Sequence, residues 1–442
     1  MLASGVSHAA SATAAITLLT AWYWASEALP IAATSLIPFA LFPLAGVINH
    51  KVAASGLGSH IIILLLGGFI AAKALERSGA HKQFAIMILS AVGTSNAKRL
   101  MAAFMLTAAS LSMWISNTAT CLMLMPIVLA CAKQLKQPNL TAPLILSVAY
   151  ACSIGGIATL IGTPPNVIFA GIYEEVSGRE FGFLDWMKIG LPIVLVLLPI
   201  AWLWLSRSLS SSATQDPASI LEKQAWTSDQ KRVISVFCLM VFLWVFRTQP
   251  FGGWTGLSGL NGIGDATVAM LGATLMFVVR SEKGGGLLDW ETANKIPWGI
   301  LLMFAAGITI AKAFFESGLA DLIGAGLSGV VSALPIYLVM LLVCLSITFF
   351  TEVNSNLATT TLVLPILAAT ATSTGLPIEL LMIPATISAS CAFMLPVATA
   401  PNAIAYATEK ITIKQMMREG FALNLILAFV ISGLAYVLLN QL

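Results

Sequence analysis

The stretch MWISNTATCLMLMP, residues 113–126, places polar side chains inside a segment that is otherwise apolar. Ser116, Asn117 and Thr118 bring two hydroxyls and an amide into it. A similar stretch, TEVNSNLATTTLVLP, follows at residues 351–365. Because polar groups are costly in an apolar environment, these two stretches are the first candidates for a functional site.

The composition indicates a multi-pass membrane protein. Of the 442 residues, 58% are hydrophobic and 9% are charged, whereas about a quarter of the residues in a soluble domain are charged. Apolar stretches long enough for spans of about 20 residues are expected to be helical, because lipid offers the backbone no hydrogen-bond partners. The formal net charge of +3 is small and scattered, which argues against a nucleic-acid partner.

The apolar segments predict an all-α fold. They lie near residues 12–29, 31–47, 59–76, 99–132, 142–178, 187–206, 232–247, 264–280, 297–316, 335–373, 379–408 and 419–440. Three of them, 99–132, 142–178 and 335–373, are too long for one span and contain polar or Pro-rich motifs. We expect re-entrant hairpins or interrupted helices at these three places.

Basic residues predict which side of the membrane each connection faces, because Lys and Arg concentrate in cytoplasmic loops. They cluster within 77–99, 133–136, 207–232, 280–295 and 410–418, whereas the connections 174–188, 248–263 and 317–334 are poor in them. This alternation requires 99–132 to enter and leave on the cytoplasmic side and 335–373 to do so on the outside. Each polar stretch therefore lies at the turn of a hairpin.

An internal repeat relates the two halves of the chain. GGFIAAKALERSG (67–79) resembles AGITIAKAFFESG (306–318), and the Ser-Asn pair of the first polar stretch recurs in the second. GTPPN (162–166) returns as ATAPN (398–402). An odd number of membrane crossings separates the copies, so they have opposite orientations. Inverted repeats with interrupted helices indicate a secondary transporter with its site near the membrane midplane.

Each repeat supplies ligands for both a cation and an anion. Pro164, Pro165 and Pro401 interrupt helical hydrogen bonding and free carbonyl oxygens. Carbonyl and hydroxyl oxygens suit an alkali cation, and helix N-termini suit an anion. No Lys, Arg or His occurs between Arg99 and Lys133 or between Lys312 and Lys410. Because a desolvated anion needs a counter-charge, this absence predicts cation-coupled anion transport.

Other polar residues have a structural interpretation beside a functional one. Ser and Thr commonly join membrane helices, but two copies in inverted register favour a site. Glu352 is either a proton or cation ligand or a carboxylate in water, and Glu27 is as readily a structural contact. Lys73 and Lys312 recur near helix ends, where snorkelling explains them equally well. GAGLSG (324–329) lacks the strand and acidic partner of a dinucleotide site and is typical of an amphipathic arm.

The paired Ser-Asn motifs, GTPPN, ATAPN and the run SCAFMLPVATAPNAIA (390–405) resemble the divalent anion sodium symporter family, the INDY-like carriers of dicarboxylates and citrate. The resemblance covers essentially the whole chain, with Ala405 replacing Val at the end of the family signature. It implies a homodimer in the bacterial inner membrane, working by an elevator movement of a transport domain against a scaffold. The family's leading helix is unmatched, so we expect ten transmembrane helices rather than eleven, with both termini outside.

The resemblance also implies a division of the chain. Scaffold helices and a connecting arm would occupy residues 1–98, and the first hairpin and interrupted helix would occupy 99–178. Residues 179–334 would contain helices of both domains, a cytoplasmic loop at 207–231 and a second arm. The second hairpin and interrupted helix would occupy 335–408, and the last helix would occupy 409–442.

The same resemblance implies the site residues. The first sodium would be held by Ser112, Ser116, Asn117 and Gly162, and the second by Thr351, Asn354, Asn356 and Ala398. Substrate would meet Ser116, Asn117, Thr118, Thr163, Pro164, Ser355, Asn356, Leu357, Thr399 and Ala400. Two positions depart from the expected symmetry: Leu357 stands where some members have Thr, and Ala400 stands opposite Pro164.

We therefore expect a symporter of C4-dicarboxylates such as succinate, malate and fumarate, coupled to at least two sodium ions, and no enzymatic activity. A citrate or sulfate symporter is an alternative. An exchanger of di- or tricarboxylates is expected to carry a basic side chain at the hairpin turns, and an anion channel a ring of charges or a continuous pore. The residues show neither feature.

Overall fold

The structure is a computed structural model that describes residues 6–92, 96–135, 138–209, 225–260 and 262–439. The described part of the chain is helical and forms no β-strand. Residues 210–224, within the predicted cytoplasmic loop 207–231, lie outside the described residues.

The helices of the first half follow one another with short connections. They are α1 (His8–Ser26), α2 (Ile31–Thr34), α3 (Ile37–Leu44), α4 (His50–Ser55), α5 (His60–Ser78), α6 (Ala80–Val92), α7 (Ala97–Ser112), α8 (Asn117–Leu135), α9 (Pro138–Gly156), α10 (Pro164–Ser177) and α11 (Phe183–Ser206).

The second half contains the remaining helices. Its helices are α12 (Ser228–Val245), α13 (Gly253–Ser258), α14 (Asp265–Val278), α15 (Trp290–Ala293), α16 (Trp298–Glu316), α17 (Leu319–Ser332), α18 (Ile336–Phe350), α19 (Asn356–Thr374), α20 (Glu379–Ala389), α21 (Ala400–Ala407) and α22 (Ile413–Leu439).

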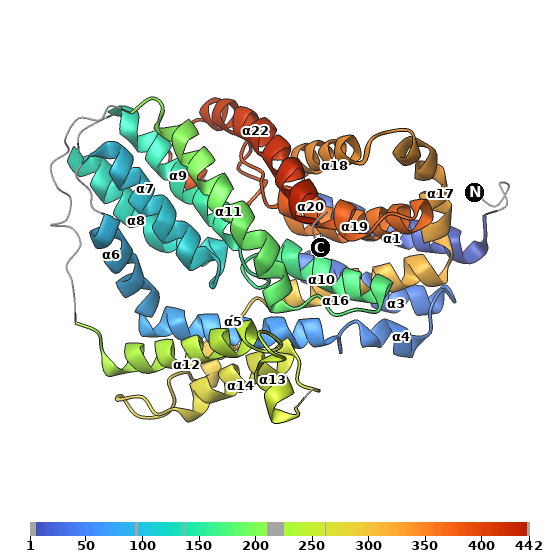
Figure 1. The fold of residues 1–442 in the computed structure, drawn as a ribbon, viewed down its shortest axis with the longest axis horizontal. Helices are drawn as coiled ribbons and strands as arrows, with labels where there is room; N and C mark the ends of the chain where they lie inside the picture. The colour runs from blue at the N-terminus through green and yellow to red at the C-terminus, as the bar shows by residue number, and fades with distance from the viewer. Residues whose placement is uncertain (1–5, 93–95, 136–137, 210–224, 261, 440–442) are drawn as a thin grey trace.

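The predicted repeat is visible as two equivalent runs of helices, α5–α11 and α16–α22. The glycines that follow the repeated motifs, Gly79 and Gly318, have nearly equal positive φ angles of 72° and 73°. Thr163 and Thr399 both adopt extended backbone, with φ of −143° and −144°, just before α10 and α21. In Figure 1, α5 and α16 run in opposite directions, as an inverted repeat requires.

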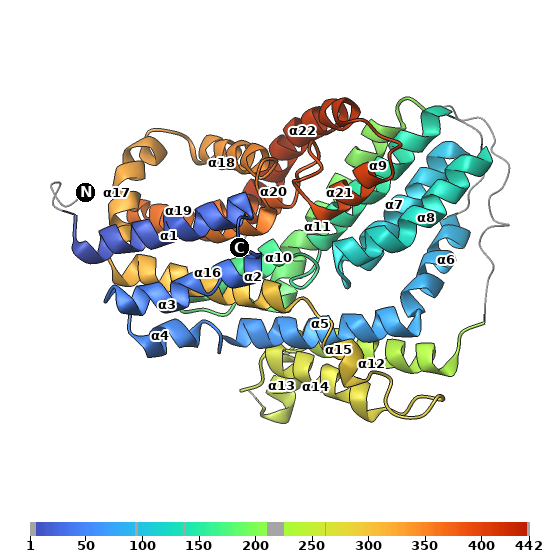
Figure 2. The same ribbon diagram turned by 180° about the vertical axis from the view of Figure 1, so that it is seen from behind.

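The over-long apolar segments break where the motifs predict. The segment 99–132 divides into α7 and α8, 142–178 into α9 and α10, and 335–373 into α18 and α19. The segment 379–408 divides in the same way, into α20 and α21. The two hairpins approach each other from opposite ends of the molecule, and their turns meet near its centre (Figures 1 and 2).

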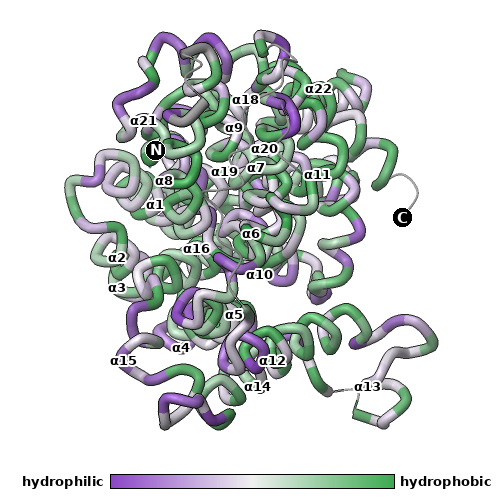
Figure 3. The backbone as a smooth tube through the Cα atoms, turned by 90° about the vertical axis from the view of Figure 1, so that its left-hand side faces the viewer, coloured by the Kyte–Doolittle hydropathy of each residue, from purple (hydrophilic) through white to green (hydrophobic). Residues whose placement is uncertain are grey.

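The fold is that of a polytopic membrane protein. Five of the described stretches are long and apolar enough to cross a membrane, and shorter apolar helices accompany them. The five are His50–Ser78, Phe183–Ser206, Trp298–Glu316, Asn356–Thr374 and Ile413–Leu439. Hydrophobic residues dominate the helices, and hydrophilic ones collect in the connections (Figure 3). The number of crossings stays a prediction, because one of the five, Asn356–Thr374, is an arm of the second hairpin.

The connecting arms are the clearest departure from symmetry. Both are helices, α6 and α17, and the predicted amphipathic motif at 324–329 lies within α17. However, α6 packs against α7, whereas α17 packs mainly against α19. The same sequence unit thus has two packing arrangements in one chain.

Candidate functional site

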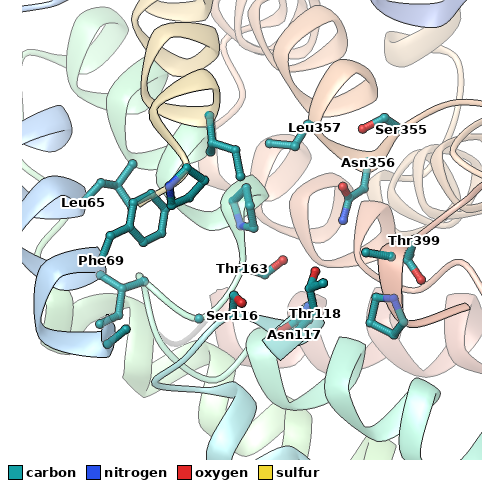
Figure 4. A pocket seen from close by; sticks show the side chains of 18 of the residues that line it. Leu65, Phe69, Ser116, Asn117, Thr118, Thr163, Ser355, Asn356, Leu357 and Thr399 are labelled. Atoms are coloured by element: carbon teal, nitrogen blue, oxygen red, sulfur yellow. The ribbon is translucent and has the colours of Figure 1, made fainter. Parts of the chain in front are cut away.

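One cavity of about 320 Å³ lies where the two hairpin turns and the two interrupted helices meet. All ten residues predicted to contact substrate line this cavity: Ser116, Asn117, Thr118, Thr163, Pro164, Ser355, Asn356, Leu357, Thr399 and Ala400. The labelled polar side chains surround one space, with Leu65 and Phe69 of α5 along one side (Figure 4). Residues from distant parts of the sequence therefore share one wall.

At the first turn, oxygen atoms from three segments converge. The Ser112 hydroxyl donates to the Cys152 carbonyl at 2.8 Å. One terminal atom of the Asn117 amide contacts that hydroxyl and lies 3.2 Å from the Cys152 carbonyl oxygen and 3.3 Å from the Gly162 carbonyl oxygen. Because all of these neighbours are oxygens, the atom at this position is the amide nitrogen, which donates to them. The oxygens themselves are of the kind that bind an alkali cation.

Gly156 makes this convergence possible. A Cβ at this position would lie 2.8 Å from the Asn117 side chain and 3.0 Å from the Gly162 carbonyl oxygen. The neighbouring residue Gly155 packs closely against α7, since a Cβ there would lie 2.4 Å from the Cα of Ala109. The two glycines let α9 approach the hairpin closely enough for the oxygens to meet.

The second turn has a similar but not identical arrangement. Thr351 and Asn354 are buried beside the cavity rather than on its wall, whereas Asn356 and Ala398 line it. The Thr351 hydroxyl donates weakly to the Ala389 carbonyl at 3.5 Å, and the Asn354 side-chain oxygen accepts from the backbone N–H of Ser355 at 2.9 Å. Thr351, Asn354 and Asn356 thus lie at one turn, and Ala398, which precedes α21, shares the cavity wall with Asn356.

The structure adds two residues that the sequence analysis quoted without giving them a role. Asn166 donates to the carbonyls of Gly156 and Thr159, at 3.1 and 2.7 Å. Asn402 donates to the carbonyls of Ala392 and Leu395, at 2.9 and 3.0 Å. Each amide holds the non-helical segment before its own half-helix. The signal was present in the sequence, because both asparagines end the repeated motifs GTPPN and ATAPN.

Helix N-termini surround the cavity. α8, α10, α19 and α21 all begin at residues on or next to its wall. Thr399 caps α21 by accepting from the backbone N–H of Asn402 at 3.3 Å, whereas the buried Thr163 hydroxyl has no protein partner among the described residues. Unpaired N–H groups and the helix dipole give such a space a preference for an anion.

Three charged residues line the cavity, Glu27, Lys73 and Glu76. Lys73 pairs with Glu76 at 2.6 Å. Lys73 is therefore not merely a snorkelling side chain: it brings a basic group to the cavity wall, although the two polar stretches contain none. Its repeat partner Lys312 instead pairs with Glu175 at 3.3 Å, on a different face.

Glu352 does not lie in water, which was one of the two readings of its position. Its side chain is buried, with 3% of the residue exposed. It accepts hydrogen bonds from Asn424 and from two backbone N–H groups beyond α20.

Comparison with known proteins identifies the family. Residues 21–381 match the family model described as citrate transporter. The chain is 39% identical over 446 residues to a sodium-dependent dicarboxylate transporter, SdcS, of Staphylococcus saprophyticus, covering 96% of this chain and 85% of the relative. A Staphylococcus aureus protein of the same name is 39% identical over 444 residues, with 96% and 84% covered. The chain belongs to the divalent anion sodium symporter family.

Because it belongs to this family, the protein is a transporter and not an enzyme. The fold is also similar to two solved transporters at 12% identity. The YdaH transporter of Alcanivorax borkumensis gives a TM-score of 0.57, covering 90% of this chain and 87% of that one. MtrF of Neisseria gonorrhoeae gives 0.62, covering 87% and 82%. These similarities concern the fold alone, and they agree with the all-α membrane architecture.

Proposed function

We propose that the protein imports C4-dicarboxylates such as succinate, malate and fumarate together with sodium ions across a bacterial inner membrane. The observation that carries the proposal is the single cavity in which the Ser-Asn turns of two inverted repeats meet. Its volume of about 320 Å³ suits a small dianion rather than a large ligand. The names of the relatives point to the same substrate class.

Sodium provides the net positive charge that the cavity wall lacks, because Lys73 on that wall is paired with Glu76. The oxygens around Asn117 form one candidate cation site, and Thr351, Asn354 and Asn356 of the second turn form the other together with Ala398, which precedes α21. Alkali cations prefer such carbonyl, hydroxyl and amide oxygens. A cation next to each turn offsets the cost of desolvating one substrate carboxylate. We therefore infer at least two transported sodium ions per dicarboxylate.

The substrate is expected to bridge the two repeats. One carboxylate meets Ser116, Asn117 and the free Thr163 hydroxyl, and the other meets Ser355 and Asn356. Four helix N-termini direct N–H groups toward this space. Lys73 contributes little net charge there, because Glu76 pairs with it.

Transport follows an elevator movement in this proposal. The hairpins and interrupted helices, within 99–178 and 335–408, move as one unit against scaffold helices that include α5 and α16, and two protomers join through their scaffolds. The arms α6 and α17 pack against different arms of the hairpins, α7 and α19, and in this proposal they are the connections that change packing when the unit moves. More than two sodium ions per dianion would add about 2.3 kcal/mol per charge per 100 mV of membrane potential.

Uptake into proteoliposomes tests this function. Radiolabelled succinate is offered with external sodium or potassium at equal ionic strength, with or without internal succinate. We expect uptake only with external sodium and without any need for internal substrate. Uptake that does not depend on external sodium but requires internal succinate would identify an exchanger instead.

A further inference from the structure

Glu352 is a buried carboxylate at the second hairpin turn. None of the ion pairs found among the described residues includes it. Its Oε1 accepts from the backbone N–H of Met394 at 2.9 Å and from the Asn424 side chain at 2.6 Å, and its Oε2 accepts from the backbone N–H of Leu395 at 2.9 Å. All three partners are donors, which suits an ionised carboxylate, since that group only accepts.

In the first repeat the hairpin is also hydrogen-bonded to the non-helical segment, but without a charged group. Met113 stands at the position equivalent to Glu352. There the Thr159 hydroxyl, in the non-helical segment, donates to the backbone carbonyl of Met113 at 2.5 Å. In both repeats the non-helical segment donates and the hairpin accepts, but the first hairpin offers a neutral carbonyl, whereas the second offers a carboxylate.

The helix that packs behind this contact is also apolar in the first repeat and polar in the second. Gly190 of α11 and Gly420 of α22 are equivalent, because each lies against the non-helical backbone after α9 or α20, at Ile157 and Phe393 respectively. Four residues later α11 carries Val194 and α22 carries Asn424. Both polar members of the Glu352–Asn424 pair are therefore apolar in the first repeat.

The segment that Glu352 holds also carries a candidate cation ligand. Met394 and Leu395 lie in the non-helical stretch between α20 and α21, and the backbone N–H of Ala398 donates to the Leu395 carbonyl at 3.3 Å. Fixing this stretch fixes the direction of the Ala398 carbonyl. Glu352 itself is next in sequence to Thr351, another predicted ligand, so its negative charge lies close to the second cation site.

We propose that Glu352 is a positioning residue for sodium, which holds the 394–398 segment in its cation-binding form and adds a fixed negative charge beside the second site. The inference rests on the proposed sodium coupling. It makes the two cation sites unequal, because the second has ionic support and the first does not. At an effective dielectric constant of about 20, a charge this close changes cation affinity on the order of tenfold or more.

Three variants test this role in the full-length protein. Glu352→Gln keeps the size of the side chain and removes its charge. The double variant E352Q/N424D returns a carboxylate to the same buried group from the neighbouring helix. Glu379→Gln is the matched control, since Glu379 is also a carboxylate of the second repeat, bonded to the Tyr173 hydroxyl at 2.7 Å, but it lies outside the cavity wall.

The measurements are the half-saturating sodium concentration and the maximal rate of succinate uptake, with the sodium-induced change in melting temperature as a second readout. We expect E352Q to raise the half-saturating sodium concentration about tenfold with little loss of maximal rate, E352Q/N424D to recover most of it, and E379Q to match the wild type. If E352Q does not fold, the double variant carries the test.

Two results would overturn the role of Glu352. One is an unchanged sodium dependence in E352Q, and the other is a double variant as impaired as E352Q or worse. Absence of sodium dependence in the wild type would instead refute the proposed function, so the two failures are distinguishable.

Discussion

The two hairpin turns share a backbone and differ in chemistry. Both present a Ser-Asn pair at the start of a helix of 19 residues, next to a half-helix that begins after an extended Thr. The first turn adds Thr118, whereas the second has Leu357 at the same place. The second turn adds Glu352, whereas the first has Met113. Geometry is therefore set by the repeated motif, and charge and polarity are adjusted separately in each copy.

This difference suggests that the two turns have different roles in binding substrate and cation. The first turn has the additional hydroxyl on the cavity wall, so it is better equipped to recognise substrate. The second has the buried carboxylate behind the wall, so it is better equipped to hold a cation. The following predictions test what the turns share and then what separates them.

The largest effect is expected from the shared asparagines. Asn117→Ala or Asn356→Ala should each abolish sodium-dependent succinate uptake, because a lost hydrogen-bonding partner of a charged group costs about 1.5–3 kcal/mol and each turn serves both cation and anion. Asn294→Ala, in the connection after α15, is the control and should transport normally. Normal uptake in either turn variant would show that the site lies elsewhere.

A large effect specific to the first turn is expected from Gly156→Ala. The added methyl group would approach the Asn117 side chain and the Gly162 carbonyl to 2.8 and 3.0 Å. Overpacking of this kind costs about 1–3 kcal/mol, so sodium affinity measured by uptake should fall about tenfold or more. Gly326→Ala, in α17, adds a methyl group where no atom lies within 4 Å and should behave as wild type. Equal behaviour of the two variants would contradict the close-packed cation site.

A moderate effect should separate the turns as substrate contacts. Thr118→Val removes one hydroxyl, which is worth about 0.5–1.5 kcal/mol, and should raise the KM for succinate several-fold while leaving the sodium dependence unchanged. Leu357→Thr adds the matching hydroxyl to the second turn and should change the ranking of malate against succinate. Competition of unlabelled dicarboxylates against labelled succinate measures both effects. A change in sodium dependence alone would assign these positions to the cation sites.

The smallest effect is expected from the repeated lysines. Lys312 pairs with Glu175 at 3.3 Å and its side chain is 18% exposed, whereas Lys73 lies at the edge of the cavity. Partly exposed ion pairs contribute about 0.2–1 kcal/mol. Lys312→Gln should therefore change the maximal uptake rate slightly, and Lys73→Gln should change mainly the KM for succinate. The same response from both variants would mean that the repeats use these lysines alike.

Much of the architecture follows from the sequence because it depends on local and repeated signals. The breaks after Ser112 and Gly156 occur where polar residues and prolines interrupt apolar segments, and the repeated motif pairs them with breaks in the second half. The ten predicted substrate contacts come together for the same reason. Their roles as ligands stay predictions.

Other features depend on packing that the sequence does not encode locally. The motif around Lys73 recurs around Lys312, yet of the two lysines Lys73 lines the cavity and Lys312 pairs with Glu175 of α10. Glu352 could not be distinguished from a water-exposed carboxylate, since its partner Asn424 lies on a distant helix. The role of Asn402 likewise becomes visible only when the carbonyls of the interrupted segment are placed.

The central claim is that sodium and dicarboxylate bind to the same pair of turns and stabilise each other. Equilibrium binding of succinate to the purified protein, in sodium or in choline at equal ionic strength, tests it most directly. Reciprocal coupling of about 1–3 kcal/mol corresponds to an affinity change of about 5- to 150-fold. We expect succinate to bind more tightly in sodium by a factor in this range, and equal affinity in the two salts would contradict the account.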